Sequence, residues 1–589
     1  PEQAGVAAAL LLGDATAMSG PEWDRYARAG VVHALAISGQ HLVVLGWFAW
    51  FVLRLTGLRR RQAAAAVALF LLAYALLTGG RPAAMRAAVM VGVFCGGVLL
   101  VRPVLPANAL ACAWLAVLML NPTDPFTPGC QLSFAATAVL MAAASWFRRP
   151  ELSPVEELTE ESRPAWLRAV RELGRMTLVL YAVNLILWLA ATPLIAHWNH
   201  VVSPVAVLVG PPVVLLSSLA LVAGFLLLLA LPLGGWLAAP FAWLTGTLLE
   251  MCQGLVGWAN AAPGGCLFLA GPGLWWLAGF YAGLAALLLL AGTGLPVRRW
   301  ALTGGAAWLG VGLLAGIARP VADELRVTFL AVGHGGCTVL ETPDGRVLLY
   351  DAGAITGPEV TRRRIAPFLW HRGVGRIDEV FLSHADLDHF NGLPDLLERF
   401  PVGQITLAGG FTARDSPGVE LLLRRADELG VPVRTAVAGD RFAAGEVTLE
   451  VLHPPREGME GDENVRSLVL RVTHAGHTIL LTGDLEGPGL ARVLNLPPGA
   501  TDVLMAPHHG SRRSNTPELA DTTRPRLVVS SQAAPLWPPR QPSPYEERRI
   551  PVLATHEHGA VTLLSHRGGL VVETFRGNQR WAVRPEGAP

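Results

Sequence analysis

Apolar residues fill the first half of the chain in long blocks, separated by short stretches rich in Gly, Pro and Arg. Each block approaches the ~20 residues that a helix needs to cross a bilayer, and so many in succession exclude a soluble core. Several are shorter than a full span, which leaves tilted or re-entrant segments open. The predicted helices, about ten, cover 42–58, 63–79, 84–101, 107–120, 131–147, 176–197, 205–230, 236–258, 274–292 and 300–318.

The pattern changes after Pro320. From Asp323 onward charged residues recur every few positions and the apolar runs shorten to strand length. We therefore predict two domains: an all-α transmembrane bundle over residues 1–320 and an α/β domain over 321–589. The mean hydropathy of +0.43 and the 15% of charged residues are typical of a membrane protein. Because the chain starts at Pro1 rather than Met, we expect it to be a fragment of a longer protein.

Arginines between the predicted helices indicate an orientation. If each of the ten predicted helices crosses the membrane once, one side carries residues 59–61, Arg102, the loop 148–175 and residues 298–299. The positive-inside rule makes that side cytoplasmic, so the last crossing places residues 321–589 outside. A miscount of one helix would reverse the assignment. The net charge of +1 offers no bulk attraction for nucleic acid.

The segment Ser383–His389 carries the spacing H-x-D-x-D-H directly after an apolar run. Imidazoles and carboxylates together suit Zn²⁺ or Mn²⁺. His384 and Asp386 alternate and project together, while Asp388 and His389, beyond the bend, can reach a second ion about 3.5–4 Å away. The pattern predicts a centre for two divalent metal ions; the alternative is a solvated turn with chance histidines.

Two later apolar runs also end in ligand types. Asp484 is the natural bridging carboxylate, and His508 or His509 would close the site. Asp388, His389 and Asp484 are the predicted catalytic residues. The predicted metal ligands are His384, Asp386, Asp388, His389, Asp484, His508 and His509.

Further residues are candidates for supporting roles. Asp351 ends the run 347–350 and would hold a metal-bound histidine by a hydrogen bond, although a strand-end turn residue is the alternative. Ser511 and Arg512 follow the two histidines, and an arginine suits a phosphate.

With these motifs, residues 323–589 resemble a metallo-β-lactamase fold, an αββα sandwich. The sequences of the motifs are similar to those of the ComEC family. That family usually opens the domain with a D-V-G-Q-G-D-like turn, where this chain has A-V-G-H-G-G at 331–336. The acids are replaced by Ala331 and Gly336, which adds as an alternative a site that binds metal but cuts poorly.

The resemblance also suggests residues between the first motif and Asp484. Asn464 and Ser467 match an N-x-x-S segment that would contact substrate or complete the metal centre. Many relatives carry an additional histidine in this region, for which the candidates are His453, His474 and His477.

The membrane half resembles the same family in the segments 33–41, 79–87 and 131–137. Polar residues within a bundle are costly, so they indicate either a hydrated path for a polyanion or hydrogen bonds between helices. The candidates for lining a channel are His33, Ser38, Gly39, His41, Arg81, Arg86 and Gln131.

The resemblance implies a DNA-uptake channel of the inner membrane for natural transformation. Its metal domain would be a phosphodiesterase or nuclease that hydrolyses double-stranded DNA outside while one strand is translocated. A DNA receptor and a cytoplasmic motor or single-strand-handling protein are expected partners, because the chain carries no phosphate-binding G-x-x-x-x-G-K-[ST] loop. Oligomerisation remains open. The alternatives are a membrane-anchored hydrolase of another phosphodiester and a DNA channel with a degenerate metal domain.

Overall fold

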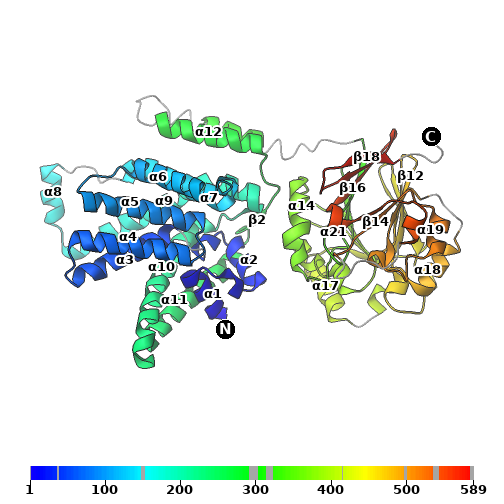
Figure 1. Ribbon diagram of the computed structural model, residues 1–589, viewed down its shortest axis with the longest axis horizontal. Helices are drawn as coiled ribbons and strands as arrows, with labels where there is room; N and C mark the ends of the chain where they lie inside the picture. The colour runs from blue at the N-terminus through cyan, green and yellow to red at the C-terminus, as the bar shows by residue number, and fades with distance from the viewer. Residues whose placement is uncertain are drawn as a thin grey trace. The chain divides into compact units, whose positions relative to one another are not determined.

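The computed structural model describes residues 2–35, 39–147, 153–290, 303–312, 323–413, 416–496, 501–534 and 543–583 (Figure 1). The chain divides into two compact units, Pro1–Gly312 and Leu313–Pro589. Each unit has its own clusters of buried apolar residues. The boundary predicted at residue 320 lies outside the described residues.

The first unit is a helical bundle, and a helix lies over each predicted apolar block. Of the last block, only residues 303–312 belong to the described part of the chain, and they are helical. The other helices are α3 (Gly39–Leu55), α4 (Arg60–Leu77), α5 (Pro82–Leu100), α6 (Pro106–Leu120), α7 (Pro128–Ala143), α9 (Ala165–Asn199), α10 (Ala206–Ala230), α11 (Gly235–Ala261) and α12 (Leu274–Leu290).

Smaller elements were not predicted. They are α1 (Glu2–Leu12), α2 (Gly20–Arg28), α8 (Pro154–Glu161) and the antiparallel pair β1 (Val201–Val202) and β2 (Leu267–Phe268). The described elements of this unit are therefore helical apart from one two-stranded pair. No long apolar run marks α2 or α8, which explains why a search for membrane spans passes over them.

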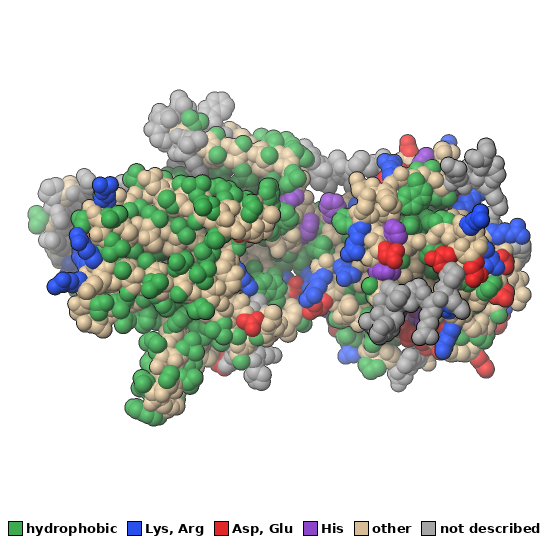
Figure 2. Space-filling view, in the orientation of Figure 1, with side chains coloured by type: hydrophobic (Ala, Val, Ile, Leu, Met, Phe, Trp, Pro, Cys, Tyr) green, Lys and Arg blue, Asp and Glu red, His purple; other side chains and the backbone are tan. Residues whose placement is uncertain are grey.

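Within the described residues, five helices are long and apolar enough to cross a membrane, fewer than the ten spans predicted. They cover Val32–Leu55, Arg60–Leu77, Pro82–Leu100, Ala165–Asn199 and Ala206–Leu233. Large apolar side chains such as Leu77, Leu178 and Trp243 are exposed. Apolar groups also cover much of the visible surface of this unit (Figure 2). Such a surface is stable in lipid rather than in water, so the first unit belongs to a membrane protein.

The second unit contains two sheets. The nine-stranded sheet has the order β18-β17-β16-β3-β4-β5-β6-β7-β8, and the seven-stranded sheet has the order β15-β14-β13-β12-β11-β10-β9. The first comprises β3 (Leu325–Phe329), β4 (Thr338–Glu341), β5 (Val347–Tyr350), β6 (Glu379–Leu382), β7 (Ile405–Ala408), β8 (Val433–Ala436), β16 (Val561–His566), β17 (Gly569–Thr574) and β18 (Arg580–Val583). The second comprises β9 (Arg441–Ala444), β10 (Val447–His453), β11 (Val469–His474), β12 (His477–Leu481), β13 (Val503–Met505), β14 (Leu527–Ser530) and β15 (Val552–Ala554).

One apolar cluster joins the two sheets, with Phe381 of β6 and Leu481 of β12 among its buried members. Helices lie on the outer faces (Figure 1). They are α14 (Ala366–His371), α16 (Leu393–Leu397) and α17 (Pro417–Glu428) beside the nine-stranded sheet, and α18 (Gly487–Leu494), α19 (Pro517–Thr523) and α20 (Pro544–Glu547) beside the other. Two sheets between helical layers form an αββα sandwich, which confirms the predicted fold class.

Alternation along β10 determines which of its side chains face the core. Val447, Leu449, Val451 and His453 are buried, whereas the residues between them are more exposed. Successive strand residues point to opposite faces, so Val447, Leu449 and Val451 all face the core between the sheets. A bulge follows Val451, and His453 pairs with Val469, which packs in the cluster on the outer face, so the buried histidine does not continue the apolar row.

Candidate metal centre

Adjacent parallel strands deliver the predicted ligands to one edge of each sheet. In the nine-stranded sheet, β5 and β6 are parallel and lead into Asp351 and the segment Ser383–His389. In the other sheet, β12 and β13 are parallel and lead into Asp484 and the turn at 507–510. Because parallel strands end at the same edge, loops that are far apart in the sequence meet there.

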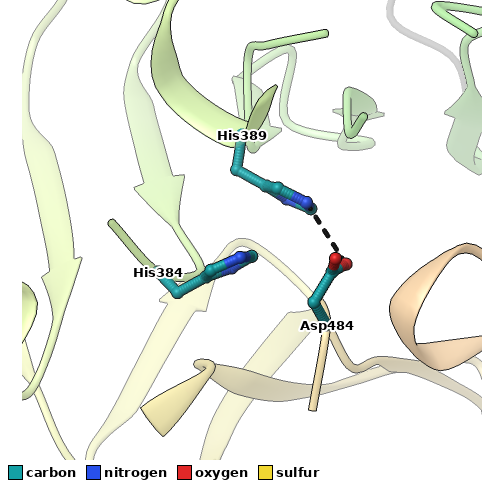
Figure 3. Close-up of side chains that lie close together, drawn as sticks. All are labelled: His384, His389 and Asp484. Carbon is teal, nitrogen blue, oxygen red and sulfur yellow. Dashed lines mark ion pairs between the residues drawn. The ribbon is translucent and has the colours of Figure 1, made fainter. Parts of the chain in front are cut away.

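Five side chains form a compact group, which we call the cradle: His384, Asp388, His389, Asp484 and His509. Donor atoms of His384, His389 and Asp484, the side chains drawn in Figure 3, all lie within 4.8 Å of one another. The donor atoms of Asp388, His389 and His509 form a second such group. Nε2 of His389 lies 3.2 Å from Oδ1 of Asp484, and Nε2 of His509 lies 3.3 Å from Oδ2 of Asp484. Asp484 thus lies between His389 and His509, the position expected of a bridging ligand.

The Nδ1 atoms of the three cradle histidines are each occupied. Nδ1 of His389 lies 2.8 Å from Oδ2 of Asp351, and Nδ1 of His509 lies 2.8 Å from the carbonyl oxygen of Ser531. Nδ1 of His384 lies 2.9 Å from Oγ of Ser383. Metal-binding histidines are commonly oriented in this way, with one nitrogen held so that the other faces the ion.

The opposite nitrogens are buried and unsatisfied. Nε2 of His384, His389 and His509, together with Oδ1 of Asp484, make no hydrogen bond of good geometry within the described part of the chain. An unpaired buried polar atom costs ~1–3 kcal/mol, so several pointing at one another need a common partner. A divalent cation is such a partner, and the donor set fits zinc or manganese.

The cradle residues shift one another's pKa. Burial raises the pKa of Asp388, but its interactions with His509 and His389 outweigh burial and bring the pKa to about 2. Burial also raises the pKa of Asp484, and the same two histidines hold it well below its usual range. Both carboxylates therefore stay ionised and supply the negative charge that a divalent cation requires.

The turn after β13 has an unusual backbone. His508 and His509 both adopt left-handed conformations, with φ of 50° and 52°. Such values are rare for residues with a Cβ and often mark functional sites. Nε2 of His508 lies 3.8 Å from Asp484, while its Nδ1 lies 3.0 Å from Oε2 of Glu486. His509 is buried in the cradle, and His508 lies at its partly exposed edge.

Other predicted ligands lie around the cradle. Oδ2 of Asp386 lies 3.6 Å from Nε2 of His384. Asn464 is a hydrogen-bond neighbour of Glu486 at 3.4 Å, which connects it to the cradle through His508. Ser511 is half-buried and Arg512 is exposed, both directly after the turn.

The three histidines considered for the region before Asp484 separate clearly. His474 and His477 pair across the β11–β12 hairpin, at the start of β12, whereas Asp484 follows its end. His453 is fully buried; its Nδ1 lies 2.9 Å from the carbonyl oxygen of Ser467, and its Nε2 makes no hydrogen bond to a described residue. Of the three, His453 combines one held ring nitrogen with one that has no described partner, but it belongs to neither group of cradle donor atoms.

Sequence reasoning omitted three residues that contact this region: Ser383, Glu486 and His334. Oγ of Ser383 lies 2.8 Å from Oδ2 of Asp351 and so links that carboxylate to His384. The ring centroid of His334 lies 4.4 Å from that of His509. Ser383 stands inside the motif itself, and Glu486 is two positions after Asp484, so proximity in sequence was the available signal.

In the first unit, the three motif segments meet at one guanidinium. Nε of Arg86 donates to Oγ of Ser133 at 2.7 Å, and its Nη1 donates to Oγ1 of Thr137 at 2.6 Å. A Cβ added to Gly39 would lie 2.2 Å from Nη2 of Arg86. Among described residues no carboxylate lies within ion-pair distance of this buried cation.

The remaining channel candidates are dispersed. His41 is buried, whereas His33 and Arg81 are exposed, and Nη2 of Arg81 donates to the carbonyl oxygen of Gly13 at 3.1 Å. Gln131 donates to the carbonyl oxygen of Pro125 and accepts from Trp198. Ser38 lies outside the described residues.

Comparisons with known proteins match each unit to a family. Residues 10–294 match the model of the competence protein family, and residues 331–526 match that of the metallo-beta-lactamase superfamily. These matches confirm the family resemblance that the motifs predict.

Alignments with individual relatives cover most of the chain. The chain is 29% identical over 557 residues to ComE operon protein 3 of Bacillus subtilis (strain 168), and the alignment covers 90% of this chain and 67% of that protein. It is 28% identical over 599 residues to competence protein ComA of Neisseria gonorrhoeae, covering 97% of this chain and 76% of that protein. Among solved structures, Zn²⁺-bound PqqB from Methylobacterium extorquens has 14% identity and a TM-score of 0.28, covering 39% of this chain and 87% of that chain.

Proposed function

The chain joins a domain of the competence protein family to a domain of the metallo-β-lactamase superfamily, and we propose from this premise that it is a DNA-uptake channel of the cell membrane. Its second domain would be a two-metal phosphodiesterase that hydrolyses double-stranded DNA on the outer side of the membrane while a single strand passes through. The observation that carries the enzymatic part is the convergence on Asp484 of three buried imidazole nitrogens that have no hydrogen-bond partner among the described residues.

In this proposal, the cradle residues with Asp386 and His508 hold two divalent ions, zinc or manganese. When bound, the ions supply positive charge beside the scissile phosphate and lower the pKa of the attacking water. The protein's own residues prepare the site. Asp351 accepts a hydrogen bond from Nδ1–H of His389, which leaves the Nε2 lone pair of that histidine facing inward.

Asp484 and Asp388 have a second role, which is to remain ionised. Their negative charge balances the ions, and the burial of Asp484 and the three cradle histidines limits contact with bulk water, which strengthens each electrostatic interaction. The loss of the acids at Ala331 and Gly336 does not remove any cradle residue. The intact donor set supports an active metal domain rather than a degenerate one.

For the membrane unit, we propose that Arg86 and the motif segments around it belong to the path of the DNA strand. A buried cation without a carboxylate partner among the described residues is costly in a bilayer, and intramembrane charges usually mark a functional site. A phosphodiester anion would supply the missing charge. The relatives' printed names, competence protein ComA among them, support DNA as the transported molecule.

The hydrolase part is tested on the full chain in lipid nanodiscs. Hydrolysis of single- and double-stranded DNA is measured with zinc, manganese or EDTA, for the wild type and for Asp388→Asn combined with His389→Ala. We expect metal-dependent cleavage in the wild type and at least ~10³-fold less in the variant, since charge stabilisation of this kind contributes several kcal/mol. The matched control, Asp427→Asn with His371→Ala, changes two exposed residues outside the cradle. Equal cleavage by wild type and cradle variant would refute the assignment.

Uptake distinguishes the channel from a tethered hydrolase. A competent strain that lacks the gene is complemented with the wild type or with Arg86→Gln, and internalised labelled DNA is counted. We expect only the wild type to restore uptake. Restored DNA cleavage without any restored uptake by the wild-type gene would favour the membrane-anchored hydrolase.

The outer location of the second domain has its own test. A cysteine introduced at exposed Arg576 is labelled with an impermeant maleimide in intact spheroplasts and in lysed ones. Labelling in intact spheroplasts is expected. Labelling only after lysis would place the domain in the cytoplasm and contradict the proposed orientation.

A further inference from the structure

His334 lies beside the cradle but has no assigned role. It belongs to the loop between β3 and β4, and its ring centroid lies 4.4 Å from that of His509 with an angle of 47° between the planes. The side chain is half-buried, and its ring nitrogens make no hydrogen bond to any residue that the structure describes. A polar ring that is partly buried yet uncommitted has donor capacity available for a ligand.

The backbone holds His334 in place. Its carbonyl oxygen accepts a hydrogen bond from the amide of Ile355 at 2.8 Å. The next residue, Gly335, has φ of 136°, and its carbonyl oxygen accepts from Oγ of Ser531 at 2.9 Å. A Cβ at Gly335 would lie 2.6 Å from the carbonyl oxygen of Asp388. The loop is therefore pressed against the segment that carries a cradle carboxylate, so the imidazole is preorganised.

The position suits contact with a bound group better than ligation of an ion. His334 is absent from both sets of donor atoms that lie within 4.8 Å of one another. Its ring instead packs on His509, and the charges of Asp388 and Asp484 act on it at longer range. From its position against His509, the imidazole of His334 would reach the non-bridging oxygens of a phosphate held by the cradle.

We propose that His334 is a substrate-binding residue, whose imidazole N–H donates a hydrogen bond to a non-bridging oxygen of the phosphodiester. This inference rests on the proposed function, since it assumes that the cradle receives a phosphate. A neutral imidazole suffices for the donation. The residue positions the phosphate and is not needed to hold the ions.

The test uses inorganic phosphate as the probe and the zinc- or manganese-loaded full chain in nanodiscs. The dissociation constant of phosphate is measured by isothermal titration calorimetry, and the number of bound metal ions is measured by mass spectrometry. Two variants separate the donor from the ring: His334→Phe keeps an aromatic ring on His509 without an N–H, and His334→Gln keeps an N–H donor. We expect phosphate to bind about 10-fold more weakly to the Phe variant and within about 3-fold of wild type to the Gln variant.

Metal content should equal that of the wild type in both variants. Loss of an ion would overturn the proposal, because His334 would then act as a ligand, and an unchanged phosphate affinity in the Phe variant would overturn it as well. If the Phe variant has a lowered melting temperature, the comparison passes to His334→Ala against His334→Gln. Phosphate affinity that depends on His334 in a protein that does not cleave DNA would refute the nuclease while leaving this assignment intact.

Discussion

Oδ2 of Asp351 lies 2.8 Å from Nδ1 of His389, and both side chains are completely inaccessible to solvent. The same carboxylate accepts hydrogen bonds from the amide and the hydroxyl of Ser383, at 2.7 and 2.8 Å. Asp351 therefore fixes both the first histidine loop and the tautomer of His389. Its effect on a metal ion passes through the imidazole.

We expect Asp351→Asn to weaken metal binding by 10- to 100-fold, the usual effect of losing a hydrogen-bond partner of a metal-bound histidine. Zinc affinity is measured by competition with a chromogenic chelator. Asp378→Asn is the matched control, since Asp378 also ends a loop and accepts a backbone hydrogen bond, from Val347, but lies outside the cradle. Equal losses in the two variants would mean that Asp351 acts only on folding.

The sequence predicted the parts of the site that depend on strand ends. Asp351, Asp388 and Asp484 lie in loops that follow short apolar runs. β5 and β6 pair in parallel in one sheet, β12 pairs in parallel with β13 in the other, and the apolar cluster between the sheets brings the three loops together. The sequence could not show which of His508 and His509 lies in the cradle, because this depends on two successive residues in left-handed conformations that no local pattern indicates. His334 was overlooked for a related reason, since its neighbour His509 is remote in the sequence.

The helical half was predicted less completely. Each apolar block is helical over the residues that the structure describes, since long apolar runs determine helices directly. Among the described helices, however, α6 and α7 have only 15 and 16 residues, shorter than a full span. The pairing of β1 with β2 joins segments that are far apart in the chain, and two-residue strands leave no periodic signal.

Removing metal should lower the stability of the second domain. Three buried imidazole nitrogens and a carboxylate oxygen have no hydrogen-bond partner among the described residues, and an ion would satisfy them. A ligand that binds only the folded state adds RT ln(1 + [L]/Kd), about 2.7 kcal/mol at 100 times Kd. We expect the melting temperature of the full chain to rise on adding zinc or manganese and to fall with EDTA. Asp484→Asn should abolish most of this response. If neither metal nor EDTA changes the melting temperature of the wild type, the metal centre is contradicted.

Restoring an acid at position 336 should damage the site rather than improve it. A Cβ on Gly336 would lie 3.0 Å from Oδ2 of Asp351 and 3.1 Å from Nδ1 of His389, so a side chain there pushes this pair apart. We expect Gly336→Ala to weaken zinc affinity by about 10-fold and Gly336→Asp by more, because a second carboxylate also repels Asp351. Gly375→Ala is the control, since nothing lies within 4 Å of its added Cβ. Tighter zinc binding by Gly336→Asp would show that the loop relaxes to accept the acid.

The approach of Gly39 to Arg86 gives the last prediction. A methyl group on Gly39 would overlap Nη2 of Arg86, which is fixed by Ser133 and Thr137, so Gly39→Ala must displace the guanidinium or separate the helices. Overpacking of this kind costs about 1–3 kcal/mol. We expect Gly39→Ala to lower both the melting temperature of the protein in detergent and DNA uptake.

Two further variants separate packing from charge in that experiment. Gly92→Ala, on the same helix as Arg86, meets no atom within 4 Å and should behave as wild type. Arg86→Lys keeps the positive charge but cannot donate to Ser133 and Thr137 from a planar fork, so it should retain part of the uptake, whereas Arg86→Gln, which has no charge, should retain none. If Arg86→Gln folds with the wild-type melting temperature and still takes up DNA, the guanidinium is a packing element and the transported strand does not depend on it.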